Sequence, residues 1–217
     1  MVASTGGRVK AVIFDYGGVL RHDGRELWST IDPLVGLPPG ALWAAWHDIP
    51  EYRLSRQGAI DGATFRRAIH RALIPVAGDA ARAEAALAGL EKHLASLPTV
   101  DPDMRALIDR LRAAGRVKLG LLSNANREFG DRLRALGVAA LFDDVVVSAD
   151  VGCAKPDPAA FKLAADRLGV APDACLMIDD QPGHLPGAEA AGMLTHRFTW
   201  GDHAALVTRL EAEGVLA

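Results

Sequence analysis

Short, nearly continuous apolar runs recur along the chain, and segments with helical spacing lie between them. The apolar runs cover residues 9–14, 117–122, 145–147, 175–178 and 194–198. Apolar residues at three- and four-residue intervals cover residues 103–114, 127–136, 156–168, 185–191 and 202–213. A strand that is apolar throughout is buried on both faces, as in a parallel sheet covered by helices. The alternation therefore predicts an α/β fold built around a parallel sheet.

One long segment interrupts this alternation. Residues 21–99 contain no convincing strand pattern, and helical spacing is found at 42–55, 62–73 and 80–95. Breaks are expected at Pro33, Pro38, Pro39, Pro75 and Gly78. An all-helical insertion after the first strand would lie as a cap over the edge of the sheet. We therefore expect a core domain made of residues 1–20 and 99–217 and a helical cap domain made of residues 21–98.

Composition and charge indicate a folded protein that binds neither nucleic acid nor membrane. The 217 residues include 24 Lys and Arg and 27 Asp and Glu, which gives a net charge of −3. Proteins that bind nucleic acid or acidic membranes usually carry an excess of basic residues. No run approaches the ~20 apolar residues of a membrane span, and the first residues lack the apolar region of a signal peptide. Cys153 and Cys175 match neither a disulfide framework nor a zinc pattern, so we expect a cytoplasmic protein in which both pack inertly.

Polar residues follow the predicted strands where ligands bind in open parallel sheets, just beyond the carboxyl ends. In chain order they are Asp15, Ser123, Asn124, Lys155, Asp179 and Asp180. Three carboxylates within a few ångströms would repel by several kcal/mol per pair at an effective dielectric constant of about 20. Lys155 can neutralise one charge. Mg²⁺, a hard cation that takes oxygen ligands, is the expected partner for the rest.

Four motifs in this order are similar to those of the haloacid dehalogenase superfamily, most of whose members are phosphatases with an aspartate nucleophile. VIFDYGGVL resembles the first motif, LLSN the second, Lys155 in AKPDP the third, and MIDDQPGHLPGAEAAGM the fourth. The helical insertion resembles the family's small α-helical cap, and GAIDGATF its recurrent cap segment. The resemblance spans nearly the whole chain and implies a Rossmann-like core domain with an inserted all-helical cap.

The resemblance assigns the chemistry residue by residue. It implies that Asp15 is a nucleophile that attacks phosphorus and forms an aspartyl phosphate. Ser123 and the backbone amide of Asn124 would hold the transferring phosphoryl oxygens, and Lys155 would neutralise charge on Asp15 and the phosphate. The implied reaction is magnesium-dependent hydrolysis of a phosphate monoester of a small soluble metabolite, by a monomer or homodimer.

The resemblance also implies a metal site. Its ligands would be Asp15, Asp179, Asp180 and the backbone carbonyl of Gly17, and its ion Mg²⁺. Two adjacent acids directly after an apolar strand have no simple packing explanation, which agrees with this assignment. The family commonly has Asn where His184 stands in the fourth motif, a difference that we expect to be minor.

One position departs from the family pattern. Most of its phosphatases carry a second Asp two residues after the nucleophile, a general acid that protonates the leaving group and then activates water. Here that residue is Gly17. Positioned proton transfer contributes ~10²–10⁴ in rate. We hypothesise that His22, Asp23 or a cap residue takes this role, or that the substrate has a good leaving group, such as an anomeric or acyl phosphate.

Two other functions stay open on the sequence. One is carbon–halogen hydrolysis, in which the aspartate attacks carbon without a metal, although the paired acids after the fourth strand favour metal use. The other is a non-catalytic regulatory protein that binds phosphate and metal, because the usual acid is replaced by Gly17. The sequence does not name a substrate. We expect the remaining conspicuous side chains to be structural or solvated. His22, His184 and His196 would be surface or hydrogen-bonded histidines, Trp43 and Trp46 would pack in the cap core, and Arg53 and Arg56 would lie on a solvated helix face. The alternative for the two arginines is that they face a substrate anion from the cap.

Overall fold

The computed structural model describes residues 9–216 of the chain, and its centre is a five-stranded sheet. All strand pairs are parallel and the spatial order is β3-β2-β1-β4-β5. The strands are β1 (Ala11–Phe14), β2 (Lys118–Ser123), β3 (Asp144–Val147), β4 (Cys175–Asp179) and β5 (Leu194–Arg197). Each coincides with a predicted apolar run to within two residues. The predicted α/β fold with a parallel sheet is thus confirmed.

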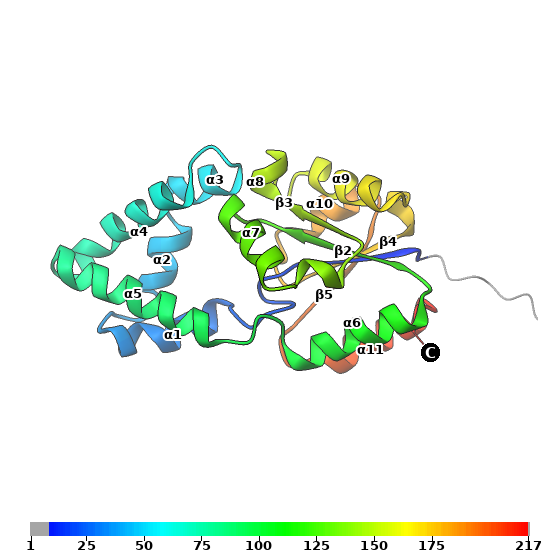
Figure 1. Cartoon of the computed structure of the whole chain (residues 1–217), viewed down its shortest axis with the longest axis horizontal. Helices are drawn as coiled ribbons and strands as arrows, with labels where there is room; N and C mark the ends of the chain where they lie inside the picture. The colour runs from blue at the N-terminus through cyan, green and yellow to red at the C-terminus, as the bar shows by residue number, and fades with distance from the viewer. Residues whose placement is uncertain (1–8, 217) are drawn as a thin grey trace, which may run out of the picture.

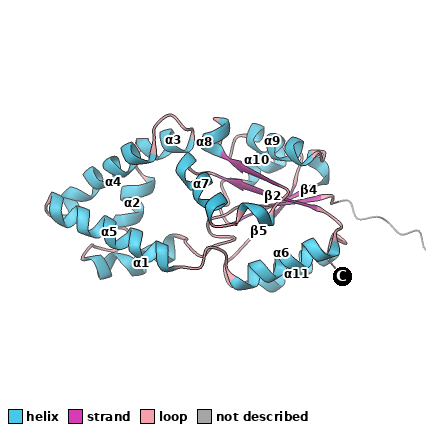
Figure 2. Ribbon diagram, in the orientation of Figure 1, coloured by secondary structure: helices cyan, strands magenta, loops and turns pink. Residues whose placement is uncertain are grey.

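Helices cover both faces of the sheet, as Figures 1 and 2 show. They are α6 (Pro102–Ala114), α7 (Arg127–Ala135), α8 (Ser148–Val151), α9 (Pro158–Leu168), α10 (Leu185–Ala190) and α11 (His203–Ala212). Alternate residues of β1 serve the two faces, because successive strand side chains point in opposite directions. Val12 and Phe14 pack in the cluster that includes α6 and α11, whereas Ile13 packs with Phe161 of α9. Both faces are therefore buried, which explains the unbroken apolar strands.

The inserted segment folds into helices that lie to one side of the sheet (Figure 1). They are α1 (Arg25–Ile31), α2 (Ala41–His47), α3 (Pro50–Arg56), α4 (Gly62–Ala77) and α5 (Ala80–Ser96). These helices have a hydrophobic core of their own, which includes the fully buried Leu42, Leu73 and Leu87. The helical character expected for the insertion is what the structure shows. We use "cap" below for α1 to α5.

Three details of the cap and core differ from the sequence prediction. The single helical segment expected at 42–55 is two helices, because Pro50 is well tolerated in the first turn of a new helix but not inside a continuing one. The break expected at Pro75 does not occur: α4 continues to Ala77, and Pro75 removes only one hydrogen bond in its last turn. The helices α1 and α8 were not predicted. Both are short, seven and four residues, so few periodic positions mark them.

Two linkers join the cap to the core, and hydrogen bonds hold the linkers together. The Tyr16 hydroxyl donates to the Thr99 carbonyl oxygen over 2.7 Å, and the Asp101 amide donates to the Leu20 carbonyl oxygen over 2.7 Å. The Arg21 guanidinium donates to the carbonyl oxygen of Leu94 in α5. The chain therefore enters and leaves the cap at one place.

Two sequence predictions fall partly on residues outside the described range. One is the expected core domain, of which residues 1–8 and 217 are not described. The other is the expectation that the first residues do not form a signal peptide, because most of these residues are not described. Within residues 9–216, no helix has both the length and the apolar character needed to span a membrane.

Candidate active site

The carboxyl ends of β1 and β4 bring two of the predicted acids together. Phe14 pairs with Ile178, so the next residues, Asp15 and Asp179, lie side by side at the carboxyl edge of the sheet, where Asp179 is the last residue of β4. The ammonium Nζ of Lys155 lies between them, 2.8 Å from Asp15 Oδ1 and 2.7 Å from Asp179 Oδ2. The strand order reverses at β1 and β4, which is where open α/β sheets bind ligands.

The three groups depend on one another because they are removed from water. Neither the Lys155 nor the Asp179 side chain has any exposed surface. Burial alone would raise the pKa of Asp179, but Lys155 and His184 overcome it and hold this pKa at about 2. Burial likewise raises the pKa of Asp15, against the opposing effect of Lys155. Removing one partner of such a buried set leaves an uncompensated charge, which is strongly destabilising.

Asn124 positions the Lys155 segment with its side chain. Its Nδ2 donates to the Lys155 carbonyl oxygen over 2.8 Å, and its Oδ1 accepts from the Lys155 amide over 2.9 Å. Because Asn124 directly follows β2, these paired bonds fix the Lys155 backbone to the carboxyl edge of the sheet. The family resemblance implied a role for Asn124 through its backbone amide only. The side-chain contacts are an additional finding.

Asp180 carries a charge that its surroundings do not neutralise. Its Oδ2 accepts a hydrogen bond from Gln181 Nε2 over 2.7 Å, whereas Oδ1 is buried and has no partner among the described residues. Burial, together with the nearby Asp15 and Asp179 carboxylates, raises the pKa of Asp180 to about 7. Gly18 leaves the room that this carboxylate occupies: its φ is +74°, and a Cβ there would lie 2.3 Å from Asp180 Oδ2.

These residues fit a divalent cation. Ligand atoms of Asp15, Asp179 and His184 all lie within 4.8 Å of one another. Asp180 is outside this group, but it lines the same cavity and the Asp15 and Asp179 carboxylates raise its pKa, so the site has three carboxylates against one buried ammonium. Carboxylate oxygens are donors that Mg²⁺ prefers. His184, expected to be a surface or hydrogen-bonded histidine, is hydrogen-bonded at the site: its Nδ1 lies 3.0 Å from Asp179 Oδ1. The sequence signal for this contact was the position of His184 in the fourth motif, five residues after Asp179 and directly before α10.

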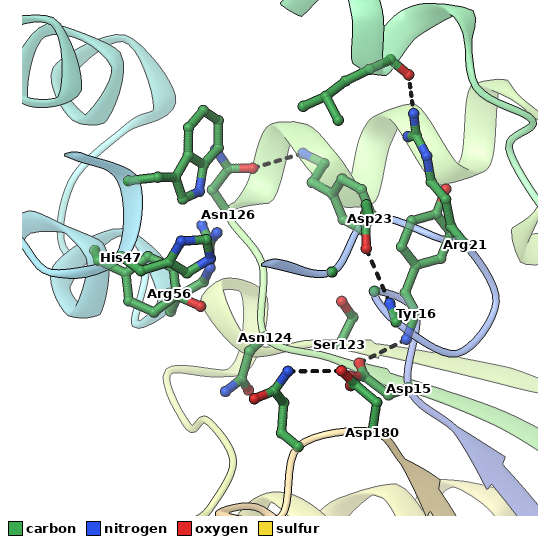
Figure 3. A pocket seen from close by; sticks show the side chains of 18 of the residues that line it. Asp15, Tyr16, Arg21, Asp23, His47, Arg56, Ser123, Asn124, Asn126 and Asp180 are labelled. Atoms are coloured by element: carbon green, nitrogen blue, oxygen red, sulfur yellow. Dashed lines mark hydrogen bonds between the residues drawn. The ribbon is translucent and has the colours of Figure 1, made fainter. Parts of the chain in front are cut away.

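A cavity of about 470 Å³ lies between the carboxyl edge of the sheet and the cap. Asp15, Ser123 and Asp180 line it from the core (Figure 3). Gly17 also lines it, so the loop proposed to supply a carbonyl ligand is at the site. Of the core residues predicted to act in catalysis, substrate binding or metal binding, all except Lys155 and Asp179 line this cavity, and those two lie buried directly behind Asp15.

The cap supplies aromatic and cationic side chains to the same cavity. Trp43 and Trp46 were expected to pack in the cap core. They do pack against it, but they also line the cavity. The expectation that Arg56 is solvated is wrong: its guanidinium lies 4.5 Å from the centre of the Tyr52 ring, and its Nε is buried without a hydrogen-bond partner among the described residues. Arg53 is exposed, as expected.

His22 and Asp23, the two candidates named for the acid that Gly17 lacks, occupy different places. The His22 ring stacks on Trp200, with ring centres 4.5 Å apart and planes 10° apart, and His22 does not line the cavity. Asp23 does line it, and burial raises the pKa of Asp23 to about 6. In the cap, burial lowers the pKa of His47 to about 4, so this imidazole is neutral at neutral pH.

Comparisons with known proteins relate this site to a family. A family model for haloacid dehalogenase-like hydrolases matches residues 9–192. A phosphoglycolate phosphatase of Rhodospirillum rubrum is 32% identical over 205 residues, which cover 88% of this chain and 80% of that protein. Phosphatase MT3486 of Mycobacterium tuberculosis is 41% identical over 95 residues, 42% of this chain and 43% of that protein, so this match spans less than half the length of either.

Solved structures share the whole architecture. A haloacid dehalogenase family enzyme of Bacteroides thetaiotaomicron, crystallised with magnesium and inorganic phosphate, has a TM-score of 0.64 and 21% identity, and the match covers 90% of this chain and 98% of that one. At this identity the likeness shows a common fold. The family model, in contrast, covers most of the chain and includes Asp15, Ser123, Lys155 and Asp179. This chain belongs to the haloacid dehalogenase-like hydrolases.

Proposed function

We propose that this protein is a magnesium-dependent phosphatase that hydrolyses phosphate monoesters of small metabolites through an aspartyl phosphate on Asp15. One observation carries the proposal: Asp15, held by the buried Lys155, opens into a cavity beside an Asp180 carboxylate that lacks a counter-charge. The phosphatases among the relatives support the same reaction class. Residues 21–98 would form the cap domain, with the rest of the chain as the core domain.

The contacts of Asp15 indicate which oxygen attacks phosphorus. Oδ1 accepts from the Tyr16 amide over 2.7 Å and from Lys155 Nζ over 2.8 Å. Neither contact uses Oδ2, so Oδ2 is the nucleophile. Its bond to phosphorus forms as the bond from phosphorus to the leaving oxygen breaks. Water then attacks the same phosphorus, which restores the Asp15 carboxylate and releases inorganic phosphate.

The other residues stabilise charge during these steps. Lys155 neutralises Asp15 and the phosphoryl group, and Ser123, with the Asn124 amide, binds phosphoryl oxygens. Mg²⁺ held by Asp15, Asp179, Asp180 and the Gly17 carbonyl would supply the remaining positive charge.

The cap side of the cavity points to the rest of the substrate. Arg56 is a cation with no carboxylate within ion-pair distance among the described residues, and Trp43 and Trp46 present apolar surface nearby. A metabolite that carries a second anionic group at its far end would satisfy the guanidinium. Phosphorylated carboxylic acids are therefore the class we would examine first.

A direct assay tests the function. The purified protein is incubated with p-nitrophenyl phosphate in Mg²⁺ or in EDTA, beside Asp15→Asn and the surface control Asp109→Asn. We expect metal-dependent release that Asp15→Asn abolishes and the control retains. Turnover of a haloacid without metal would instead indicate carbon–halogen hydrolysis. Tight vanadate binding without turnover would indicate a regulatory protein.

A further inference from the structure

The loop after Asp15 folds back on itself and returns a second carboxyl group to the site. The Tyr16 carbonyl oxygen accepts from the Leu20 and Arg21 amides over 2.8 and 3.1 Å, and the Gly18 amide donates to the Arg21 carbonyl oxygen over 2.8 Å. This tight turn brings Asp23 back against the glycines, although Asp23 is eight residues from Asp15 in sequence.

Asp23 occupies the space that a side chain at position 17 would fill. A Cβ built on Gly17 would lie 3.0 Å from Asp23 Oδ1, 3.7 Å from its Cγ and 3.8 Å from its Oδ2. All three of the nearest atoms belong to this one carboxyl group. Because Gly17 has no side chain, the Asp23 carboxyl group can lie where a side chain at position 17 would lie. The site therefore has a carboxyl group at this place, supplied from a different point in the chain.

The contacts of Asp23 fix its carboxyl group and its backbone. The Gly18 amide donates to Oδ1 over 3.0 Å, so one oxygen is held while the side chain lines the cavity. Figure 3 shows this contact above Asp15 and Ser123. The indole Nε1 of Trp28, in the cap, donates to the Asp23 carbonyl oxygen over 2.9 Å. Asp23 is thus held from the core and from the cap.

The other candidates are less well placed. His22 stacks on Trp200 outside the cavity. Glu128 lines the cavity, but its Oε1 accepts from the Gly62 amide over 2.8 Å at the start of α4. In the cap, His47 stacks on Trp43 with ring centres 3.7 Å apart. Within residues 9–216, the Asp23 carboxyl is the side-chain group nearest to a Cβ at position 17.

We propose that Asp23 is the general acid and base of the reaction, in place of the residue missing at position 17. The proposal rests on the phosphatase function proposed above. As Asp15 Oδ2 bonds to phosphorus, the protonated Asp23 gives its proton to the leaving oxygen, which departs as an alcohol. The Asp23 carboxylate then takes a proton from the water that attacks the phosphoaspartate, and is protonated again when inorganic phosphate forms.

The leaving group gives the sharpest test. The value of kcat/KM is measured for p-nitrophenyl phosphate, whose leaving group needs little protonation, and for an alkyl ester such as glycerol phosphate. Asp23→Asn keeps the shape and the Oδ1 acceptor. We expect it to lower kcat/KM on the alkyl ester by ~10²–10⁴, and on the aryl ester by less than ~10-fold. His22→Ala, the matched control, should keep both values.

The second test moves the carboxyl group from position 23 to position 17. Gly17 does not have a positive φ, so an Asp is allowed there once Asp23 is shortened. The double variant Gly17→Asp with Asp23→Ala should recover at least ~10-fold of the alkyl-ester activity that Asp23→Ala loses, because it moves the carboxyl group back to the usual position. Acid-quenched samples of Asp23→Asn should contain more phosphoenzyme, because the second step also lacks its base.

Two results would overturn the assignment of Asp23. One is an unchanged kcat/KM on the alkyl ester in Asp23→Asn. The other is an equal loss on both esters, which would indicate a structural role. If the wild type shows no metal-dependent turnover that Asp15→Asn abolishes, the phosphatase proposal itself fails. The two failures are therefore distinct, and Tm measurements on each variant identify any that does not fold.

Discussion

Replacing Asp180 by Asn is expected to stabilise the metal-free protein at alkaline pH. In the folded state, burial and the Asp15 and Asp179 carboxylates raise the pKa of Asp180 from 3.8 to about 7. A carboxyl with a raised folded-state pKa binds its proton more tightly when the protein is folded. Stability is therefore lost as the pH rises from 3.8 through about 7. Asn carries no charge at any pH, so the variant avoids this loss.

The size of the effect follows from the same pKa. The difference between 3.8 and about 7 corresponds to ~4 kcal/mol above pH 7. We reduce this to ~2–3 kcal/mol because the carboxylate is only partly buried and water screens it. In a chain of this length ~1 kcal/mol changes Tm by ~2–4 °C, so the expected gain in Tm is ~5–10 °C.

Calorimetry at pH 8 in EDTA measures this gain, and repeating it at pH 5 should give a smaller one. The control Asp109→Asn removes the same charge from an exposed ion pair with Arg105, and should change Tm by no more than ~2 °C. Mg²⁺ should raise the Tm of the wild type more than that of Asp180→Asn. An unchanged or lower Tm of Asp180→Asn at pH 8 in EDTA would refute the reasoning.

Three further predictions concern neighbouring residues. Lys155→Met leaves the buried Asp15 and Asp179 carboxylates without their cation, so calorimetry should show a loss of ~3–5 kcal/mol in the free energy of unfolding, and turnover should be abolished. Unchanged stability and turnover would contradict the dependence of Asp15, Lys155 and Asp179 on one another. Gly18→Ala places a Cβ 2.3 Å from Asp180 Oδ2 at φ +74°, so the Mg²⁺ concentration for half-maximal activity should rise, and an unchanged value would show that the loop adapts. Arg56→Met should raise KM for phosphoglycolate ~10–100-fold but leave that for p-nitrophenyl phosphate within ~3-fold; equal effects would assign Arg56 a role in cap packing.

The sequence predicted that the acids and Ser123 would meet at one edge of the sheet because they lie at the carboxyl ends of apolar strands, whereas Lys155 lies eight residues after the end of β3. Once β1 and β4 are recognised as parallel neighbours, the proximity of Asp15 and Asp179 follows from strand geometry. The contact of Asn124 with Lys155 did not follow, because an amide side chain after a strand has many local partners. The strand ends give the position of a residue but not the direction of its side chain.

The sequence left Asp23 and Arg56 ambiguous for a different reason. The position of Asp23 depends on a turn that is closed by backbone bonds to Tyr16, and no periodic pattern marks such a turn. Arg56 lies in α3, a helix of seven residues. So short a helix does not define a polar face, and the direction of Arg56 depends on how the whole cap packs over the sheet.

The hydrogen bonds between the two linkers have a consequence for engineering. Because Tyr16 binds Thr99 and Leu20 binds Asp101, the insertion is attached to the sheet through one closely spaced pair of segments. A foreign helical module of similar span could be grafted between residues 24 and 97 without disturbing the pairing of β1 with β4. Exchange of this module would replace the side chains that line the cavity from the cap, among them Trp28, whose indole binds the Asp23 carbonyl oxygen, while Asp15, Lys155 and Asp179 keep their places at the edge of the sheet.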